Sequence, residues 1–364
     1  MTKHADKVLL GAILFLLIVG IITFASASAP RSVRHFGNSY SYFLRQLILG
    51  FGLGGVFFWA GLRIPIAAWK KWAPLMLVGS LLIMLAMLTI PSISLTVGGA
   101  TRWIVLFGFS FQPSELLKFA FITYLAAWIH SRKRELASFS FGLVPFLAIT
   151  GIVGAFLLLE PDLGTFGVIA FTSLGMFIMG GGRMKQVGLI ILLGVLFLIT
   201  MSILEPYRIN RWLVFLDPDT DPQGIGYQIS QARLAIGSGG LWGRGVGLSR
   251  QKFYLPEPDG DAVFAVFAEE YGFIGVIILL GAFFLFTVRG MLAAAHTRDS
   301  FAQLLASGIT LLVVTQAIIN TAALSGLLPL TGIPLPFMSL GGTAVAFLLF
   351  EMGVLLQISK RKHL

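Results

Sequence analysis

Residues 8–25 read VLLGAILFLLIVGIITFA, an apolar run without a single charged side chain. A helix that crosses a membrane needs about 20 mostly apolar residues. Nine further stretches meet this condition, so we predict ten membrane-spanning helices. The predicted spans lie at about residues 8–25, 43–61, 73–90, 113–129, 141–159, 163–180, 187–204, 262–288, 301–324 and 341–358. Lys3, Lys7 and the small residues 25–29 also resemble a signal peptide, but the nine later spans favour an uncleaved first helix.

The composition excludes an ordinary soluble protein. Hydrophobic residues make up 57% of the 364 positions and charged residues only 12%, whereas about a quarter of a soluble chain is charged. The absence of cysteine excludes a disulfide scaffold, a thiolate metal site and a cysteine nucleophile. The sequence therefore predicts an all-α integral membrane protein, a single polytopic domain over residues 1–364.

The basic residues indicate the orientation in the membrane. If the N-terminus is inside, the predicted inner segments contain 15 basic and three acidic residues. Short cytoplasmic loops are enriched in Lys and Arg, so both termini are expected in the cytoplasm. The net charge of +10 then reflects these loops, and nucleic acid is not an expected partner.

Four polar segments gather at the opposite, outer face. They are Gln112-Pro113-Ser114-Glu115 with Lys118 one turn later, Glu160 to Thr165, Pro256 to Asp261 followed by Glu269 and Glu270, and Leu335 to Thr343 with Ser339. Each is open to reading as an ordinary helix cap, because Ser, Asp and Glu satisfy free amides at helix starts. An ionisable group within a span is costly, however, and marks a candidate functional site. Four segments at one face favour such a site.

The longest connection, about residues 205–261, is predicted outside the membrane between spans seven and eight. Long connections are usually functional or disordered, and the apolar content between Ile225 and Leu248 argues against disorder. We expect short helices that lie at the membrane interface. The glycine-rich residues 237–247 either line a site with their backbone amides or form a flexible connector.

The polar segments match a known family. The matching stretches are residues 99–104, 111–118, 160–165, 226–231, 235–243, 255–275 and 328–342, in this order and spacing. The sequence resembles the SEDS family (shape, elongation, division and sporulation) over nearly its whole length. The resemblance implies a peptidoglycan glycosyltransferase that polymerises lipid II at the outer face of the cytoplasmic membrane. It also implies a class B penicillin-binding protein, a transpeptidase, as partner.

Details of the resemblance favour one branch of the family. Residues 217–231 and 252–257 resemble the division branch more than the elongation branch. A place at the division septum with other division proteins is therefore expected, and an elongation polymerase is the alternative. Asp259-Gly260, Ala262 and Leu340 depart from the usual family pattern, but none of these departures removes a carboxylate.

The resemblance also assigns residues to a site. An essential aspartate of the family matches Asp261, and further family positions match Glu115, Lys118, Asp162, Glu269 and Glu270. Joining two lipid-linked sugars requires an acceptor hydroxyl to lose its proton to a carboxylate, and Asp261 is the candidate general base. No general acid is expected, because the leaving pyrophosphate is already stable.

The phosphate charge of such a substrate requires cations. Lys118 and Arg102 are the candidates, with Arg208 or Arg211 from the long connection. A divalent cation, Mg²⁺ or Mn²⁺, held by Glu115 or Asp162 is a further alternative, and no other cofactor is expected. A purely structural Glu115–Lys118 ion pair is open as well.

The residues before the last span contain Pro329, Pro334 and Pro336, which interrupt any helix there. Bent backbone at membrane depth is tolerated where it lines a cavity. The pattern predicts either such a lining, with a lateral opening for a lipid, or a plain outer loop.

Two other classes of protein are alternatives. A flippase that moves lipid II across the membrane would explain the spans and the buried charges equally well, but the carboxylates gather at one face only. A non-catalytic scaffold for division proteins would not explain Asp261 together with Glu115, Lys118 and Asp162.

Overall fold

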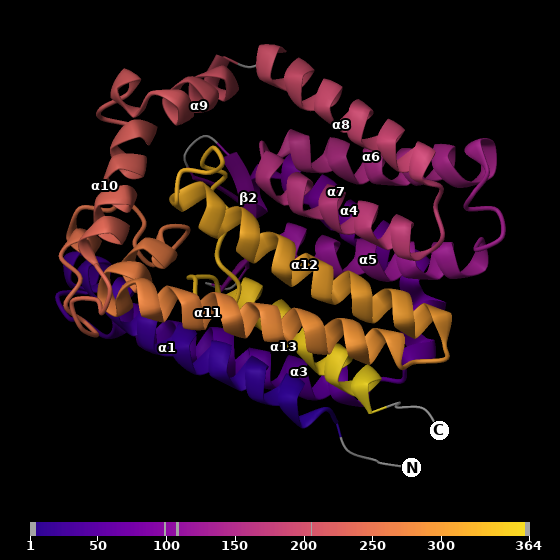
Figure 1. Cartoon of the computed structure of the whole chain (residues 1–364), viewed down its shortest axis with the longest axis horizontal. Helices are drawn as coiled ribbons and strands as arrows, with labels where there is room; N and C mark the ends of the chain where they lie inside the picture. The colour runs from indigo at the N-terminus through magenta and orange to yellow at the C-terminus, as the bar shows by residue number, and fades with distance from the viewer. Residues whose placement is uncertain (1–4, 98–99, 107–108, 205, 361–364) are drawn as a thin grey trace.

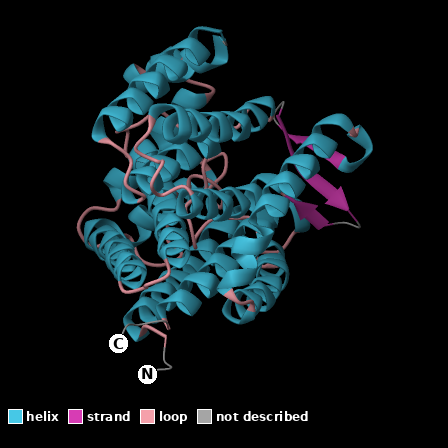
Figure 2. Cartoon of the chain, turned by 90° about the vertical axis from the view of Figure 1, so that its right-hand side faces the viewer, coloured by secondary structure: helices cyan, strands magenta, loops and turns pink. Residues whose placement is uncertain are grey.

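The computed structural model describes residues 5–97, 100–106, 109–204 and 206–360, with backbone alone at 97, 106, 109, 204 and 206–208. It is a bundle of long helices with one small sheet at its edge (Figures 1 and 2). The α-helices are α1 (Lys7–Phe36), α2 (Ser41–Arg45), α3 (Leu53–Arg63), α4 (Ile66–Thr89), α5 (Pro113–Ser131), α6 (Val144–Leu159), α7 (Leu163–Met179), α8 (Met184–Leu204), α9 (Pro206–Leu216), α10 (Ile225–Ser238), α11 (Val263–Ala295), α12 (Ser300–Leu324) and α13 (Gly342–Ser359). The strands are β1 (Ser94–Val97), β2 (Ala100–Leu106) and β3 (Phe109–Phe111), and the short helices are η1 (Gln46–Gly52), η2 (Pro91–Ile93), η3 (Phe139–Leu143), η4 (Pro218–Thr220) and η5 (Gln251–Phe253).

All ten predicted spans coincide with helices, so the helical prediction is confirmed. Within the described residues, eight helical segments are long and apolar enough to cross a membrane. The other two predicted spans are α5, whose hydropathy Glu115 and Lys118 lower, and α7, which has only 17 residues. The chain is thus built as a multi-pass membrane protein, and ten crossings remain a prediction.

The small sheet between α4 and α5 was not predicted. Its strands are antiparallel in the order β1-β2-β3, with Ser94 opposite Ile104 and Ile104 opposite Phe111. The hydroxyls of Thr96 and Thr101 lie 2.7 Å apart across the first pair. Strands of four, seven and three residues are too short for a clear alternation of apolar and polar residues.

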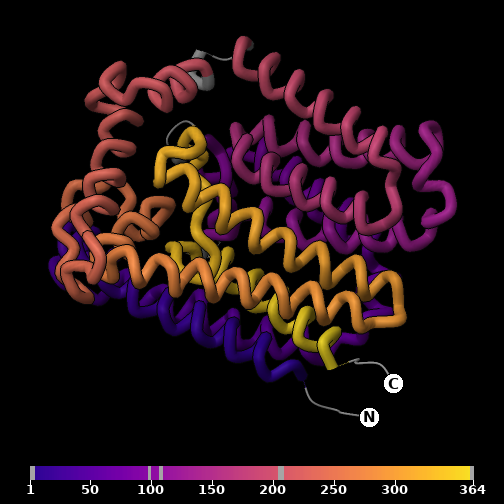
Figure 3. Tube along the Cα trace, viewed as in Figure 1, coloured from indigo at the N-terminus to yellow at the C-terminus, as the bar shows by residue number. Residues whose placement is uncertain are grey.

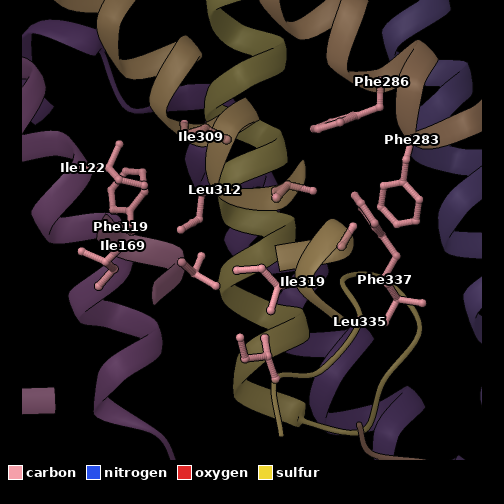
Figure 4. Packing of buried hydrophobic residues seen from close by; sticks show 14 of the residues in the cluster. Phe119, Ile122, Ile169, Phe283, Phe286, Ile309, Leu312, Ile319, Leu335 and Phe337 are labelled. Carbon is pink, nitrogen blue, oxygen red and sulfur yellow. The ribbon is translucent and has the colours of Figure 1, made fainter. Parts of the chain in front are cut away.

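The centre of the bundle is α12. Within its apolar stretch 72% of the residues are buried, compared with 11% in α8. In Figure 4 its Leu312 and Ile319 lie between Ile122 on one side and Phe283 on the other. Because α5, α7, α11 and α13 all contact α12, polar side chains on this helix reach several segments at once.

The long connection contains two α-helices, α9 and α10, and the short helices η4 and η5. Figure 3 shows α8, α9 and α10 following one another around the upper and left edges of the bundle. The expectation of short helices in residues 205–261 is therefore confirmed, while their position at a membrane interface stays a prediction.

Helix α11 is interrupted at Gly272, whose φ is 66°. The glycine-rich residues 237–247 pack against this break. The amides of residues 273 and 274 donate to the carbonyls of residues 240 and 241 at 2.8 and 3.1 Å. In return Arg244 donates its amide to the Glu269 carbonyl (2.9 Å) and Gly245 donates to the next carbonyl (3.0 Å). The backbone groups freed by the break are thus paired inside the protein, as membrane depth requires. The glycine-rich residues are a fixed part of the fold rather than a flexible connector.

Candidate active site

Asp261 lies just before α11, next to the N-cap residue Ala262. Its two carboxylate oxygens accept hydrogen bonds from Nε2 of Gln228, on α10, at 3.2 and 3.3 Å. Burial, followed by the nearby charge of Glu257, raises the pKa of Asp261 to about 6, and the hydrogen bond from Gln228 acts in the opposite direction. The residue as a whole is partly exposed. The carboxylate is therefore charged at neutral pH and more basic than an ordinary aspartate.

Asn320 connects Asp261 to the proline-rich segment, which we define as residues 329–340. Its Nδ2 donates to the backbone carbonyls of Asp261 (2.8 Å) and Ile333 (2.7 Å). The proline-rich segment contains no helix, so the predicted interruption is confirmed. Residues 330–333 of this segment, together with Asp261 and Asn320, line one small pocket.

Gln316 makes a matching connection one turn earlier on α12. Its Nε2 donates to the Pro334 carbonyl (2.9 Å), and its Oε1 accepts from Nζ of Lys118 (3.1 Å). Both Gln316 and Asn320 are buried. Sequence reasoning gave neither residue a role, although two amides four residues apart in an apolar span share one helix face.

Glu115 and Lys118 form a buried ion pair of 2.9 Å. Together with Ser339 and Glu351 they line a cavity of about 30 Å³, whose other wall includes residues 334–337 and Leu340. This volume holds about one or two water molecules. The Ser339 hydroxyl has a structural role, because it accepts a hydrogen bond from the Leu335 amide at 2.7 Å. The structure therefore brings Glu115, Lys118 and Ser339 together in a space too small for a sugar or a phosphate.

Asp162 and Arg102 belong to a third polar cluster. Asp162 caps α7 by accepting the Thr165 amide at 3.0 Å. Arg102, on β2, donates to the backbone carbonyls of Glu160 (3.2 Å) and Pro161 (2.5 Å). This cluster also abuts the proline-rich segment, because a Cβ on Gly164 would lie 3.0 Å from the Thr331 carbonyl oxygen.

Glu160 within this cluster is a buried carboxyl. Neither of its oxygens has a hydrogen-bond partner among the described residues. Burial, followed by the charge of Asp162, raises its pKa to about 8, and Arg102 opposes this shift. Glu160 is therefore mostly protonated at neutral pH. The sequence placed it in the matching stretch 160–165 but assigned a role there only to Asp162.

Glu269 and Glu270 hold the end of the long connection against α11. Glu269 accepts the Ser249 hydroxyl at 2.5 Å and the amides of residues 250 and 251 at 3.0 and 3.1 Å. Glu270 accepts the Ser26 hydroxyl and lies 3.6 Å from Nζ of Lys252. Both carboxylates are buried, and none of these contacts involves Asp261.

The two arginines predicted from the long connection differ. Arg211 donates to the Leu330 carbonyl at 3.2 Å, so α9 also contacts the proline-rich segment. The side chain of Arg208 lies outside the described residues.

The residues do not fit a divalent-cation site at the predicted positions. Glu115 is paired with Lys118, and Asp162 caps a helix. The described part of the chain contains no group of three or more His, Cys, Asp or Glu side chains arranged for a metal ion. A hard cation prefers several converging oxygens.

The whole chain is similar to proteins of known name. The family described as "Cell cycle protein", with the names FtsW, RodA and SpoVE, matches residues 7–364. A probable peptidoglycan glycosyltransferase FtsW of Coxiella burnetii is 40% identical over 351 residues, 95% of this chain and 94% of that protein. Stage V sporulation protein E of Bacillus subtilis is 37% identical over 358 residues, 98% of this chain and 97% of that protein.

A solved structure has the same fold. A chain from the structure described as "Structural coordination of polymerization and crosslinking by a peptidoglycan synthase complex" superposes with a TM-score of 0.81 at 26% identity, over 98% of this chain and 97% of that chain. Because the family pattern and these relatives extend over nearly every residue, the chain belongs to the FtsW/RodA/SpoVE family.

Proposed function

We propose that this protein is a peptidoglycan glycosyltransferase that polymerises lipid II at the outer face of the cytoplasmic membrane, for septal wall synthesis in cell division. The FtsW relative supports the activity. The mechanism rests on the Asp261 carboxylate, which Gln228 holds by hydrogen bonds and whose pKa is about 6.

In the proposed reaction a hydroxyl oxygen of the acceptor sugar bonds to the anomeric carbon of the donor, opposite the leaving group. The bond from that carbon to the phosphate oxygen breaks, and the polyprenyl pyrophosphate leaves with the electron pair. Asp261 takes the hydroxyl proton, and the anomeric configuration inverts. A base with a pKa of about 6 suits this role, because it is ionised at neutral pH and still accepts a proton readily.

Lys118 and Arg102 are assigned here as positioning residues. Lys118 acts through Gln316 on Pro334, and Arg102 fixes the carbonyls at residues 160 and 161. Both thereby stabilise the segments around Asp261. A requirement for Mg²⁺ or Mn²⁺ remains a separate proposal, which activity after chelation and metal replacement would test.

The partner in this proposal is a class B penicillin-binding protein. The similar solved chain comes from a complex described as coordinating polymerization and crosslinking. An elongation polymerase is the alternative, because the family name includes RodA. Depletion in cells distinguishes the two, since loss of septa supports division and loss of rod shape supports elongation.

The deciding experiment gives labelled lipid II to the purified full chain with its transpeptidase and separates the glycan products on a gel. Asp261→Asn is expected to reduce polymerisation at least about 100-fold, a typical contribution of a general base. Asp219→Asn is the matched control, because Asp219 is exposed on the same connection. Full polymerisation by Asp261→Asn would refute the base assignment. Translocation of lipid II in vesicles without any polymer would identify a flippase.

A further inference from the structure

A second cavity, of about 210 Å³, lies at the end of α1 beside the turn that precedes Asp261. Its lining includes Arg31, Arg34 and His35 of α1, and Lys252, Glu257 and Pro258 of the long connection. We call it the α1 basic cavity. Pockets for drug-sized ligands have about 300–1,000 Å³, so this volume suits a phosphate or a pyrophosphate and not a disaccharide.

The cavity lies where lipid headgroups are expected. Helix α1 has 30 residues and is therefore about 45 Å long, whereas the hydrocarbon core of a bilayer is about 30 Å thick. The apolar run ends at residue 25, so Arg31 and Arg34 follow it by about two turns of helix. Basic side chains near the end of a span extend to the membrane interface, where the lipid phosphates lie.

The guanidinium groups of Arg31 and Arg34 use only some of their N–H donors within the protein. Arg31 uses Nη1 on the Asp259 carboxylate (3.3 Å) and stacks over the ring of Tyr42 at 5.3 Å. Arg34 uses Nη2 on the Phe253 carbonyl (2.8 Å). A guanidinium has five N–H donors in a planar fork that matches phosphate oxygens, so most of them are available to a ligand.

The ammonium of Lys252 is already engaged. It donates to the Gly247 carbonyl (2.7 Å) and to the Ser26 hydroxyl (2.9 Å), near Glu270. Lys252 adds positive charge behind the cavity, and Arg31 and Arg34 supply the contacts.

The cavity shares a turn with the candidate base. The amides of Gly260 and Ala262 both donate to the Glu257 carbonyl, at 3.1 and 3.3 Å. This tight turn holds Glu257, which lines the cavity, next to Asp261. The lining of the α1 basic cavity and the candidate base therefore belong to one turn of the backbone.

We propose that the α1 basic cavity binds the phosphate or pyrophosphate of a lipid headgroup through Arg31 and Arg34. Two lipids share this chemistry, the lipid-linked sugar substrate and an anionic phospholipid. Only the first source rests on the proposed function. In that case the cavity supplies the cations that Lys118 and Arg102, held in other clusters, do not bring to the pyrophosphate.

The test measures lipid binding to the full chain in detergent by native mass spectrometry. The probes are undecaprenyl pyrophosphate without a sugar, and phosphatidylglycerol. Arg34→Gln and Arg31→Lys are expected to weaken binding of one probe at least tenfold, and the affected probe identifies the source. Arg250→Gln, an exposed arginine of the same connection, is the control and should change Kd less than twofold. Unchanged Kd values for both probes in both variants would overturn the proposal.

The design keeps folding and catalysis separate from binding. Arg31→Lys retains a charge beside the buried Asp259, so a folded protein is expected, and thermal unfolding checks it. The probes carry no sugar, so Asp261→Asn should bind them like the unmodified chain. Arginine-dependent binding by a chain that never polymerises lipid II would support the cavity and refute the proposed function. Polymerisation of lipid II together with binding that does not depend on the arginines would support the proposed function and refute the cavity.

Discussion

Gln316 and Asn320 lie one turn apart on α12 and hold adjacent residues of the proline-rich segment, Pro334 and Ile333. Gln316 also accepts from Lys118, and Asn320 also donates to the Asp261 carbonyl. The central helix therefore ties the buried ion pair to the candidate base through one bent segment. A disturbance in either cluster is expected to move the other.

Asn320→Leu tests this connection. The substitution leaves the carbonyls of Asp261 and Ile333 without their donor, at a cost of about 1–3 kcal/mol for each buried group. Polymerisation should fall at least about tenfold and the melting temperature should fall as well. Thr321→Val is the control, because that hydroxyl bonds only within α12. Activity of Asn320→Leu within twofold of the unmodified protein would contradict the connection.

Gln228→Leu tests how Asp261 is tuned. Asp261 must be ionised to act, so kcat/KM should rise with pH through the pKa of about 6. The hydrogen bond from Gln228 lowers this pKa, and its loss should shift the acidic limb of the pH profile to higher pH. Gln231→Leu removes an amide from the same helix and should leave the limb in place. An unshifted limb in Gln228→Leu would show that this amide does not tune the base.

Features that depend on local sequence were predictable, and those that depend on distant pairing were not. The apolar runs predicted the helices, and the i, i+3 spacing of Glu115 and Lys118 predicted their contact. The sheet was missed because its strands are very short. The bridging role of Asn320 and the packing of the glycine-rich residues against Gly272 depend on partners 13 or more residues away in the sequence. The periodicity of apolar residues predicts helices and strands but not which distant residues make contact.

The ion pair of Glu115 and Lys118 permits a test that separates structure from catalysis. Lys118→Met leaves Glu115 buried without its partner, which should cost about 3–5 kcal/mol of stability. The double variant Glu115→Gln/Lys118→Met carries no unpaired charge, so thermal unfolding should recover most of this loss. Polymerisation is expected to stay below about a tenth of normal, because Gln316 has lost its contact. Recovery of full activity would establish a purely structural pair.

Glu160→Gln tests the protonated carboxyl. A folded-state pKa of about 8, above the ordinary value of 4.5, means that its stability contribution is complete below pH 4.5 and is lost as the pH rises through 8. The glutamine variant does not ionise, so its melting temperature should exceed that of the unmodified chain by an amount that grows between pH 5 and pH 8. Glu135→Gln, an exposed glutamate, should show no such trend. Parallel melting curves for Glu160→Gln and the unmodified chain would indicate an ordinary pKa.

Gly243→Ala tests the closure of the glycine-rich segment on the break in α11. Gly243 has a φ of 79°, and a Cβ there would lie 2.2 Å from the Glu270 carbonyl oxygen. The segment would have to move away, which would break the hydrogen bonds that satisfy the interrupted helix and would lower the melting temperature. Gly237→Ala is the matched control, since it lies within α10 with no atom inside 4 Å of the added carbon and should gain about 0.5–1 kcal/mol of stability. If both variants melted alike, the segment would be free to leave α11, and the freed backbone of the break would need another partner.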